Sequence, residues 1–220
     1  MKIGFLIPVY NEEKTINRLI EMLPGERKDI IVVDDGSTDK TSEIIGMTGA
    51  TLLKHKQNMG KGQAHRTGFK YGVKHKYDYL ITLDGDGQHN PKEVSKFIKR
   101  IENKGEDIIV GVRKRSLFNM PWIRYFTNLT TSFVVSFLSH RTIRDTQCGY
   151  RAISTKVLRK VSLATCNFQT ESEILIKAAK LGYRIGEVPI STIYKKENSK
   201  ISPVIDTLRF IVLAFKSIWR

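Results

Sequence analysis

Two aspartates separated by one glycine provide oxygen atoms of the kind that bind divalent cations. Asp84 and Asp86 directly follow an apolar, β-prone run at residues 79–83, and the glycine between them is typical of a tight turn. Carboxylate oxygens are the ligands that Mg²⁺ and Mn²⁺ prefer, and a cation held in this way can grip a diphosphate. Most isolated Asp-Gly-Asp triplets are solvated turns, so this motif by itself leaves both interpretations open.

The residues after the two aspartates indicate where in a fold the motif lies. Asn90 and Pro91 are residue types typical of a helix cap and of the first helical position. The aspartates are therefore expected between the carboxyl end of a strand and the beginning of a helix. In open α/β sheets, ligands bind at this edge.

Two earlier predicted strands end in polar residues in the same way. The strand at residues 3–9 leads into Tyr-Asn-Glu-Glu at residues 10–13, and the strand at residues 30–34 leads into Asp-Gly-Ser-Thr at residues 35–38. Helical segments separate the strands, in the alternation typical of a parallel sheet. We therefore expect three polar clusters along one edge of that sheet.

The hydrophobic pattern of the whole chain predicts an α/β fold. The 220 residues, of which 40% are hydrophobic and 27% charged, suffice for one domain with a substantial core. Strands are expected at residues 3–9, 30–34, 51–54, 79–83, 107–112, 148–154 and 183–189. Helices are expected at residues 14–23, 39–46, 61–75, 91–103, 122–138, 171–181 and 203–219. A basic, glycine-rich turn containing Lys61 follows the third strand, and an ordinary helix start explains it equally well.

The formal net charge of +15 is unevenly distributed along the chain. No acidic residue occurs between Glu43 and Asp78 or between Asp107 and Asp145, whereas both stretches contain several basic residues. Such blocks attract anionic partners. Nucleic acid is one such partner, but zinc-finger spacing, an RNP-like strand and a recognisable helix-turn-helix are absent from the sequence. An anionic membrane surface fits better, because each Lys or Arg near it contributes about 1 kcal/mol.

Residues 203–220 contain a predicted amphipathic helix. Apolar residues recur in it at three- and four-residue spacing with basic residues between them: Val204, Leu208, Ile211, Phe215 and Ile218, with Arg209, Lys216 and Arg220. The segment is too short and too interrupted by charge for a bilayer span, which takes about 20 apolar residues. Two interpretations remain open, namely packing on the protein's own core and lying in the membrane interface.

The two cysteines and the N-terminus favour a cytoplasmic location. Cys148 and Cys166 lack the spacing of a metal site, so we expect reduced, buried thiols. The chain passes from Met1 directly into the first predicted strand, without the apolar run of a secretory signal.

Several motifs occur in the order of one known enzyme family. PVYNE and VDDGS begin at Pro8 and Val33, and DGDGQHNP begins at Asp84. With further segments they resemble the inverting family-2 glycosyltransferases of the GT-A fold, a Rossmann-like, mostly parallel sheet flanked by helices. DGDGQHNP is similar to the dolichol-phosphate and polyprenyl-phosphate sugar synthases of that family. The further matching segments are residues 58–64, 111–113, 145–151 and 169–171, so the resemblance covers nearly the whole chain.

The resemblance implies one GT-A domain at residues 1–202 with two functional halves. Residues 1–113 would bind the nucleotide sugar, and residues 114–202 would bind the acceptor. Residues 203–220 would follow as the amphipathic helix, and the resemblance favours its membrane interpretation.

The resemblance also implies a metal site and a nucleotide-sugar site. Mg²⁺ or Mn²⁺ would be held by Asp86 and Gln88, with Asp84 nearer the ribose or sugar. Asp34 would orient its turn, and His89 would cap or pack rather than bind metal. The implied nucleotide-sugar contacts are Pro8, Tyr10, Glu12, Val33, Asp35, Lys61, Asp84, Gly85, Lys196 and Lys200. The last two belong to a basic loop in which Tyr194 or Lys195 replaces the family's usual arginine.

The acceptor determines which further residues matter. A phosphate monoester with a second pKa of about 6 is already ionised, so it needs charge neutralisation, which arginine supplies well. The resemblance gives this task to Arg113 and Arg124, with Asp145 orienting the arginines or the acceptor groove and Glu171 bracing the site. A sugar hydroxyl would instead need a general base, and Asp145 or Glu171 would then serve.

We therefore expect a metal-dependent, inverting transfer of a hexose from GDP-mannose or a UDP-hexose to a polyprenyl or dolichyl phosphate. The enzyme would act peripherally at the cytoplasmic face of the membrane. Related enzymes often carry transmembrane helices after the catalytic domain and none is visible here, so a membrane-protein partner is a further expectation. Two alternatives remain open: a family-2 transferase acting on a sugar hydroxyl, and a non-catalytic nucleotide-sugar sensor or basic nucleic-acid-binding protein.

Overall fold

The computed structural model describes residues 1–113, 122–165 and 169–191, and at residues 122–127 it describes the backbone alone. Three features expected from the sequence lie outside the described residues: the amphipathic helix at residues 203–219, the basic loop with Lys196 and Lys200, and Cys166.

One mixed sheet of seven strands forms the centre of the described structure, in the order β3-β2-β1-β4-β6-β5-β7. Only β6 runs antiparallel to its neighbours, and the other pairings are parallel. The strands are β1 (Ile3–Val9), β2 (Ile30–Asp34), β3 (Thr51–Lys54), β4 (Tyr79–Thr82), β5 (Ile108–Arg113), β6 (Arg151–Ser154) and β7 (Ile185–Ile190). This arrangement confirms the predicted α/β class with a mostly parallel sheet.

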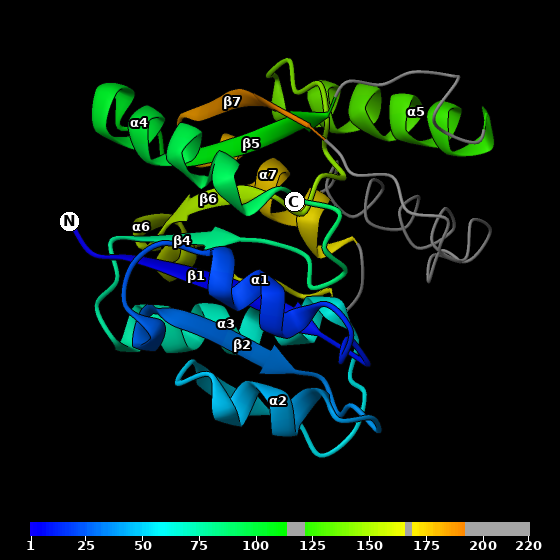
Figure 1. Cartoon of the computed structure of the whole chain (residues 1–220). Coiled ribbons are helices and arrows are strands. Elements are labelled where there is room, and N and C mark those ends of the chain that lie inside the picture. Colours follow the sequence, from blue (N-terminus) through cyan, green and yellow to red (C-terminus); the bar gives the residue numbers. More distant parts are fainter. Residues whose placement is uncertain (114–121, 166–168, 192–220) are drawn as a thin grey trace.

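Helices cover both faces of this sheet (Figure 1). They are α1 (Ile16–Met22), α2 (Thr41–Met47), α3 (Lys61–Lys74), α4 (Val94–Lys104), α5 (Trp122–Ser139), α6 (Thr155–Lys160) and α7 (Thr170–Lys180). Two short 3₁₀ turns, η1 (Arg27–Asp29) and η2 (Pro91–Glu93), precede β2 and α4. No helix of the described residues has both the length and the apolarity needed to cross a bilayer.

The central strands are buried because helices shield both of their faces. Every residue of β2 is buried, as expected for a near-continuous apolar run in a parallel sheet covered on both sides. Helix α3 approaches this layer through two glycines. A Cβ added at Gly68 would lie 2.1 Å from Leu6 Cδ1, and one added at Gly72 would lie 2.5 Å from Leu80 Cδ1. Close packing of α3 fixes where its first residue, Lys61, emerges.

The predicted strands all occur, with ends shifted by a few residues. The structure differs from the prediction at α6 and η1, which the sequence pattern did not indicate. A helix of six residues such as α6 is too short to display a helical period. Its visible signal is Ser154, whose side chain caps the helix by accepting a hydrogen bond from the backbone N–H of Lys156 at 3.3 Å.

Candidate active site at the carboxyl edge of the sheet

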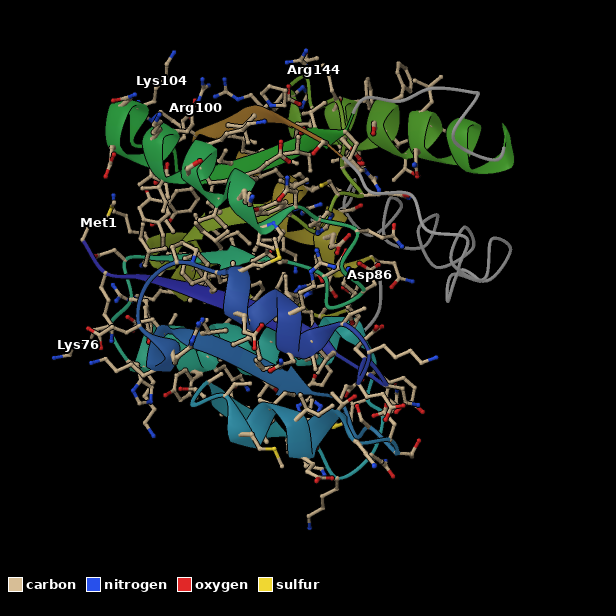
Figure 2. All side chains as sticks on the ribbon, in the orientation of Figure 1. Met1, Lys76, Asp86, Arg100, Lys104 and Arg144 are labelled. Atoms are coloured by element: carbon tan, nitrogen blue, oxygen red, sulfur yellow. The ribbon has the colours of Figure 1, made fainter. Side chains whose placement is uncertain are left out.

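The Asp84–Asp86 segment leaves β4 and packs between the end of β1 and the beginning of α1. A Cβ at Gly85 would lie 2.6 Å from Val9 Cγ1, so only glycine fits against β1 here. The carbonyl of Gly85 accepts a hydrogen bond from Thr15 Oγ1 at 2.7 Å. Figure 2 shows Asp86 on the side of the molecule opposite Met1, where β1 and β2 end.

Asp84 faces a lysine that bridges two carboxylates. The Nζ atom of Lys61 lies 2.6 Å from Asp84 Oδ1 and 2.7 Å from Glu171 Oε1. Burial is the largest influence on Asp84 and opposes its ionisation, but the charge and hydrogen bond of Lys61, together with the neighbouring His89 and His65, outweigh it. The pKa of this carboxyl therefore lies below its ordinary value. The contact brings the first residue of α3 and the first turn of α7 to the aspartate motif, across 110 residues of sequence.

The pKa of Asp86 is shifted in the opposite direction to that of Asp84. Burial and the negative charge of Asp84 raise the pKa of Asp86 to about 6. Its Oδ1 atom accepts a hydrogen bond from the backbone N–H of Gln88 at 2.9 Å, which keeps residues 86–88 in a tight turn. A cation beside these two carboxylates would favour the charged form of both.

The donor set fits a magnesium-like ion that is shared with a substrate. Among the described residues, no three His, Cys, Asp or Glu side chains converge into a metal cage. Mg²⁺ commonly uses one or two carboxylates together with waters and substrate phosphates. Asp84 and Asp86, with the amide of Gln88 beside them, match that mode of binding.

His89 points into the protein interior. Its side chain is buried, its ring packs 5.1 Å from that of Tyr150, and Nδ1 accepts a hydrogen bond from the backbone N–H of Asp84 at 3.3 Å. Burial lowers the pKa of His89. Next to it, Asn90 accepts a hydrogen bond from the backbone N–H of Lys92 and Pro91 begins η2, as the sequence predicted for a cap and first position.

The PVYNE and VDDGS motifs lie side by side on β1 and β2. Pro8 is opposite Val33 in the parallel register. Tyr10 and Glu12 are half-buried just beyond the strand, and the backbone N–H of Glu12 donates to Thr41 Oγ1 at 2.8 Å. The structure therefore places these residues at the same edge as the aspartate motif.

Asp34 and Asp35 both bond to the chain itself. Asp34 accepts hydrogen bonds from the backbone N–H of Ser37 at 2.8 Å and from the Ser42 hydroxyl, and so orients the turn after β2. Asp35 accepts from the backbone N–H groups of Met59 and Gly60, at 2.9 and 2.8 Å. Its two oxygens thereby fix the turn that precedes Lys61, and the nucleotide-sugar contact that the resemblance implies for Asp35 stays a prediction.

His55 completes the binding of Asp35 and was not indicated by the sequence. Its Nδ1 atom lies 2.6 Å from Asp35 Oδ1, and Nε2 lies 2.9 Å from Thr67 Oγ1. This histidine therefore links the end of β3 to α3.

Arg113 and Asp145 form a two-pronged ion pair. Arg113 Nε donates to Asp145 Oδ2 at 2.7 Å and Nη2 donates to Oδ1 at 2.9 Å. Asp145 is completely buried, whereas the Arg113 side chain is 18% exposed. Burial opposes the charge of Arg113, but Asp145 outweighs it and raises the pKa of the guanidinium. Arg124 lies in α5 where only the backbone is described, so the pairing of two arginines stays a prediction.

Arg151 is a site residue whose role the sequence did not indicate. Its side chain is buried, and Nε and Nη2 donate to the carbonyls of Cys148 and Thr146, each at 2.7 Å. Nη1 donates to the carbonyl of Glu171. Arg151 thereby ties the segment after Asp145 to the first turn of α7. The sequence signal that could have indicated this role is an arginine at the edge of an apolar strand.

Gly149 joins the arginine pair to the aspartate motif. A Cβ at this position would lie 2.6 Å from Asp84 Oδ1, so the segment at residues 145–149 packs directly on the Asp84 carboxylate. Arg113, Asp145 and the Lys61 cluster thus belong to one continuous site.

Comparison with known proteins agrees with this geometry. Residues 5–162 match the family described as Glycosyl transferase family 2. The UDP-N-acetylglucosamine--dolichyl-phosphate N-acetylglucosaminyltransferase of Methanococcus voltae is 37% identical over 87% of this chain and 86% of its own. The undecaprenyl-phosphate mannosyltransferase of Micrococcus luteus is 28% identical over 89% of this chain and 85% of its own.

Solved structures share the fold. The glucosyl-3-phosphoglycerate synthase of Mycobacterium tuberculosis, in complex with Mg²⁺ and uridine diphosphate, superposes with a TM-score of 0.75 at 19% identity. The match covers 98% of this chain and 79% of that one. The chain therefore belongs to glycosyltransferase family 2, in the branch of the dolichol-phosphate and polyprenyl-phosphate sugar synthases.

Proposed function

We propose that the protein transfers a hexose, with inversion, from GDP-mannose or a UDP-hexose to a polyprenyl or dolichyl phosphate, using Mg²⁺ or Mn²⁺. Transfer would take place at the cytoplasmic face of the membrane, on which the protein would lie peripherally. The names of the two relatives, one a dolichyl-phosphate and one an undecaprenyl-phosphate transferase, support this acceptor class.

The observation that carries the proposal is the two-pronged Arg113–Asp145 pair. A guanidinium held in this way has one fixed orientation and N–H groups left over, which can donate to a phosphate that already carries its negative charge. Because Asp145 is buried and committed to Arg113, it is a positioning residue for that arginine.

The same geometry counts against the hydroxyl-acceptor alternative. A general base must reach the hydroxyl proton with a carboxylate that is available to accept it. Asp145 is completely buried, and Glu171 is 8% exposed and paired with Lys61. Neither carboxylate is presented in the manner of a base.

The aspartate motif would bind the nucleotide-sugar donor through a metal ion. Asp84, Asp86 and Gln88 would hold the metal ion, which when bound offsets negative charge on the departing nucleoside diphosphate. Lys61 adds a further positive charge beside Asp84. Pro8, Tyr10, Glu12, Val33 and Asp35 would line the nucleoside side, and Asp35 also holds the turn before Lys61.

A matched pair of acceptors tests the proposal. Radiolabelled nucleotide sugars would be offered with a polyprenyl phosphate and with the corresponding polyprenol, in the presence of Mg²⁺ or Mn²⁺. We expect labelled lipid from the phosphate alone. Excess EDTA should abolish the transfer, and added metal should restore it. Transfer to the polyprenol, or turnover that persists in EDTA, would contradict the acceptor or the metal assignment respectively.

A further inference from the structure

Helix α5 exposes large apolar side chains to solvent, although it also buries Val135 and Leu138 in the core. Its buried side carries Thr131 and Ser132, which bond to the segment after Asp145: Gln147 Nε2 donates to Thr131 Oγ1 at 3.2 Å, and Ser132 Oγ lies 3.3 Å from Thr146 Oγ1. Its outer side carries Leu129, Phe133 and Phe137. A surface helix normally points such residues toward the core.

The three outer residues form one continuous surface, which we call the α5 apolar stripe. Leu129, Phe133 and Phe137 are 48%, 71% and 69% exposed, and residues four apart lie next to each other along a helix. Single exposed apolar residues are normal on protein surfaces, whereas contiguous ones mark interaction sites. The other exposed large hydrophobics of the described residues stand singly; Met47, for example, ends α2, and Leu181 directly follows α7.

The surroundings of the stripe carry positive charge. No acidic residue occurs between Asp107 and Asp145, so α5 itself contains none. Arg141 is exposed shortly after the helix, and the Arg144 side chain is 71% exposed although it also pairs with Glu187. Apolar residues beside basic ones are typical of a surface that enters the interface of an anionic bilayer.

The stripe lies on the side of the molecule that carries the candidate site. Helix α5 follows β5, which ends at Arg113, and precedes Asp145. In Figure 1, α5 extends beyond the ends of β5 and β7, away from α4. Figure 2 places Asp86 toward that same side. A lipid whose phosphate pairs with Arg113 would need its chain in a bilayer close to this helix.

We propose that the α5 apolar stripe docks the protein on an anionic membrane, with Phe133 and Phe137 entering the boundary between headgroups and acyl chains. The inference that the stripe lies near the lipid phosphate rests on the proposed function. The docking itself rests on the exposed stripe and on the basic residues beside it. The partner of the stripe is therefore the bilayer interface, into which a helix lying flat buries its apolar face by about 5–10 Å.

The test is vesicle flotation of the full chain carrying Phe133→Ser and Phe137→Ser together. Both side chains are largely exposed, so their replacement should leave the fold intact, which circular dichroism would check. We expect the double variant to bind phosphatidylglycerol-containing vesicles at least tenfold more weakly. Met47→Ser and Leu181→Ser, which remove exposed apolar residues elsewhere, should bind as the original protein does.

A second measurement separates docking from the reaction. On a short, water-soluble polyprenyl phosphate the double variant should keep its rate, whereas on acceptor embedded in vesicles its rate should fall with its binding. Stripe-dependent flotation without any transfer would refute the proposed function and leave the docking proposal standing.

Three results would overturn the docking proposal. One is unchanged flotation of the double variant. Another is a stripe-dependent change in oligomeric state, which would assign the surface to a second copy of the chain. The third is greater protease sensitivity of residues 203–220 in the double variant than in the original protein, both without vesicles, which would assign the surface to that segment.

Discussion

Lys61 and Arg113 are two cations of the candidate site; Arg113 pairs with one carboxylate and Lys61 with two. Asp145 is completely buried and grips Arg113 with both oxygens, so this arginine has one fixed orientation. Lys61 is shared between Asp84 and Glu171, so it can exchange one partner and keep the other. The two cations therefore differ in what their removal should do.

Removal of Arg113 should damage transfer most. With a phosphate acceptor, we expect Arg113→Ala to lower the rate by about 10²–10³, the scale seen when one charge-stabilising donor is lost. Glu171→Gln should cost far less, and Asp145→Asn should lie between them because it loosens Arg113. Initial rates on polyprenyl phosphate would be measured for all three. Arg113→Lys is the control, because it keeps the charge but loses the bidentate donor geometry of the guanidinium.

The pH dependence of the same rates provides a second check. The rate should rise as the lipid phosphate ionises at about pH 6 and remain flat above it, according to the second phosphate pKa. If Glu171→Gln or Asp145→Asn were inactive while Arg113→Ala still worked on polyprenyl phosphate, a general-base mechanism would replace this one.

Replacement of Lys61 should reveal the metal site without any turnover. Its ammonium lies 2.6 Å from Asp84 Oδ1, where it opposes a second cation. We therefore expect Lys61→Met to bind Mn²⁺ several-fold more tightly in the absence of nucleotide, measured from the electron paramagnetic resonance signal of free Mn²⁺. Lys70→Met, which removes an exposed lysine of the same helix, is the control. Weaker Mn²⁺ binding in Lys61→Met would remove Asp84 from the metal site.

At the scale of elements, the sequence predicted what depends on local patterns. Apolar runs that end in Asp, Asn or Gly indicated β1, β2 and β4 and the edge at which they meet. The Asn90–Pro91 pair indicated the beginning of a helix, because both residue types act through their own backbone geometry. Such signals lie within a few residues of the feature that they predict.

The sequence could not predict contacts made between distant segments. Lys61 and Glu171 are 110 residues apart, and Arg113 and Asp145 are 32 apart. Their meeting depends on strand order, above all on β6 lying antiparallel between β4 and β5. Arg151 was overlooked for the same reason, since its partners are carbonyl groups that only the folded loop brings together.

The close approach of α3 to the sheet gives a prediction about stability. A methyl group at Gly68 would lie 2.1 Å from Leu6 Cδ1, so Gly68→Ala should destabilise the protein by roughly 1–3 kcal/mol through overpacking. Gly46, in α2, has no atom within 4 Å of an added Cβ. Gly46→Ala should therefore stabilise by about 0.5–1 kcal/mol. Urea unfolding would compare the two, and equal effects would show that α3 does not pack as described.

At the scale of the whole molecule, function depends on one edge of the sheet. Asp86 lies toward that side, while Met1 and Lys76 lie on the other (Figure 2). Helix α5 extends beyond the ends of β5 and β7 toward the same side (Figure 1). The packing that creates this edge also buries groups whose ordinary pKa lies near neutral pH, so acid should act on the fold as well as on the site.

His65 is the clearest of these groups. It lies on the inner face of α3 at 4% exposure and stacks on Phe69 with ring centroids 5.5 Å apart. Burial, with a smaller contribution from the charge of Lys61, lowers the pKa of His65 to about 3. The unfolded chain, with an ordinary histidine pKa of about 6.5, therefore binds a proton that the folded protein excludes.

The free energy of unfolding should consequently fall as the pH drops below about 6.5, and continue to fall toward pH 3. Between pH 7 and pH 5, His65 alone accounts for a loss of about 2 kcal/mol by this linkage. His65→Gln removes the titrating group, so its stability should depend less on pH by that amount, whatever its stability at pH 7. His75→Gln, which removes an exposed imidazole directly after the same helix, is the control. Urea unfolding at both pH values decides the matter: if His65→Gln and the original protein lose stability in parallel, His65 is not held neutral in the fold.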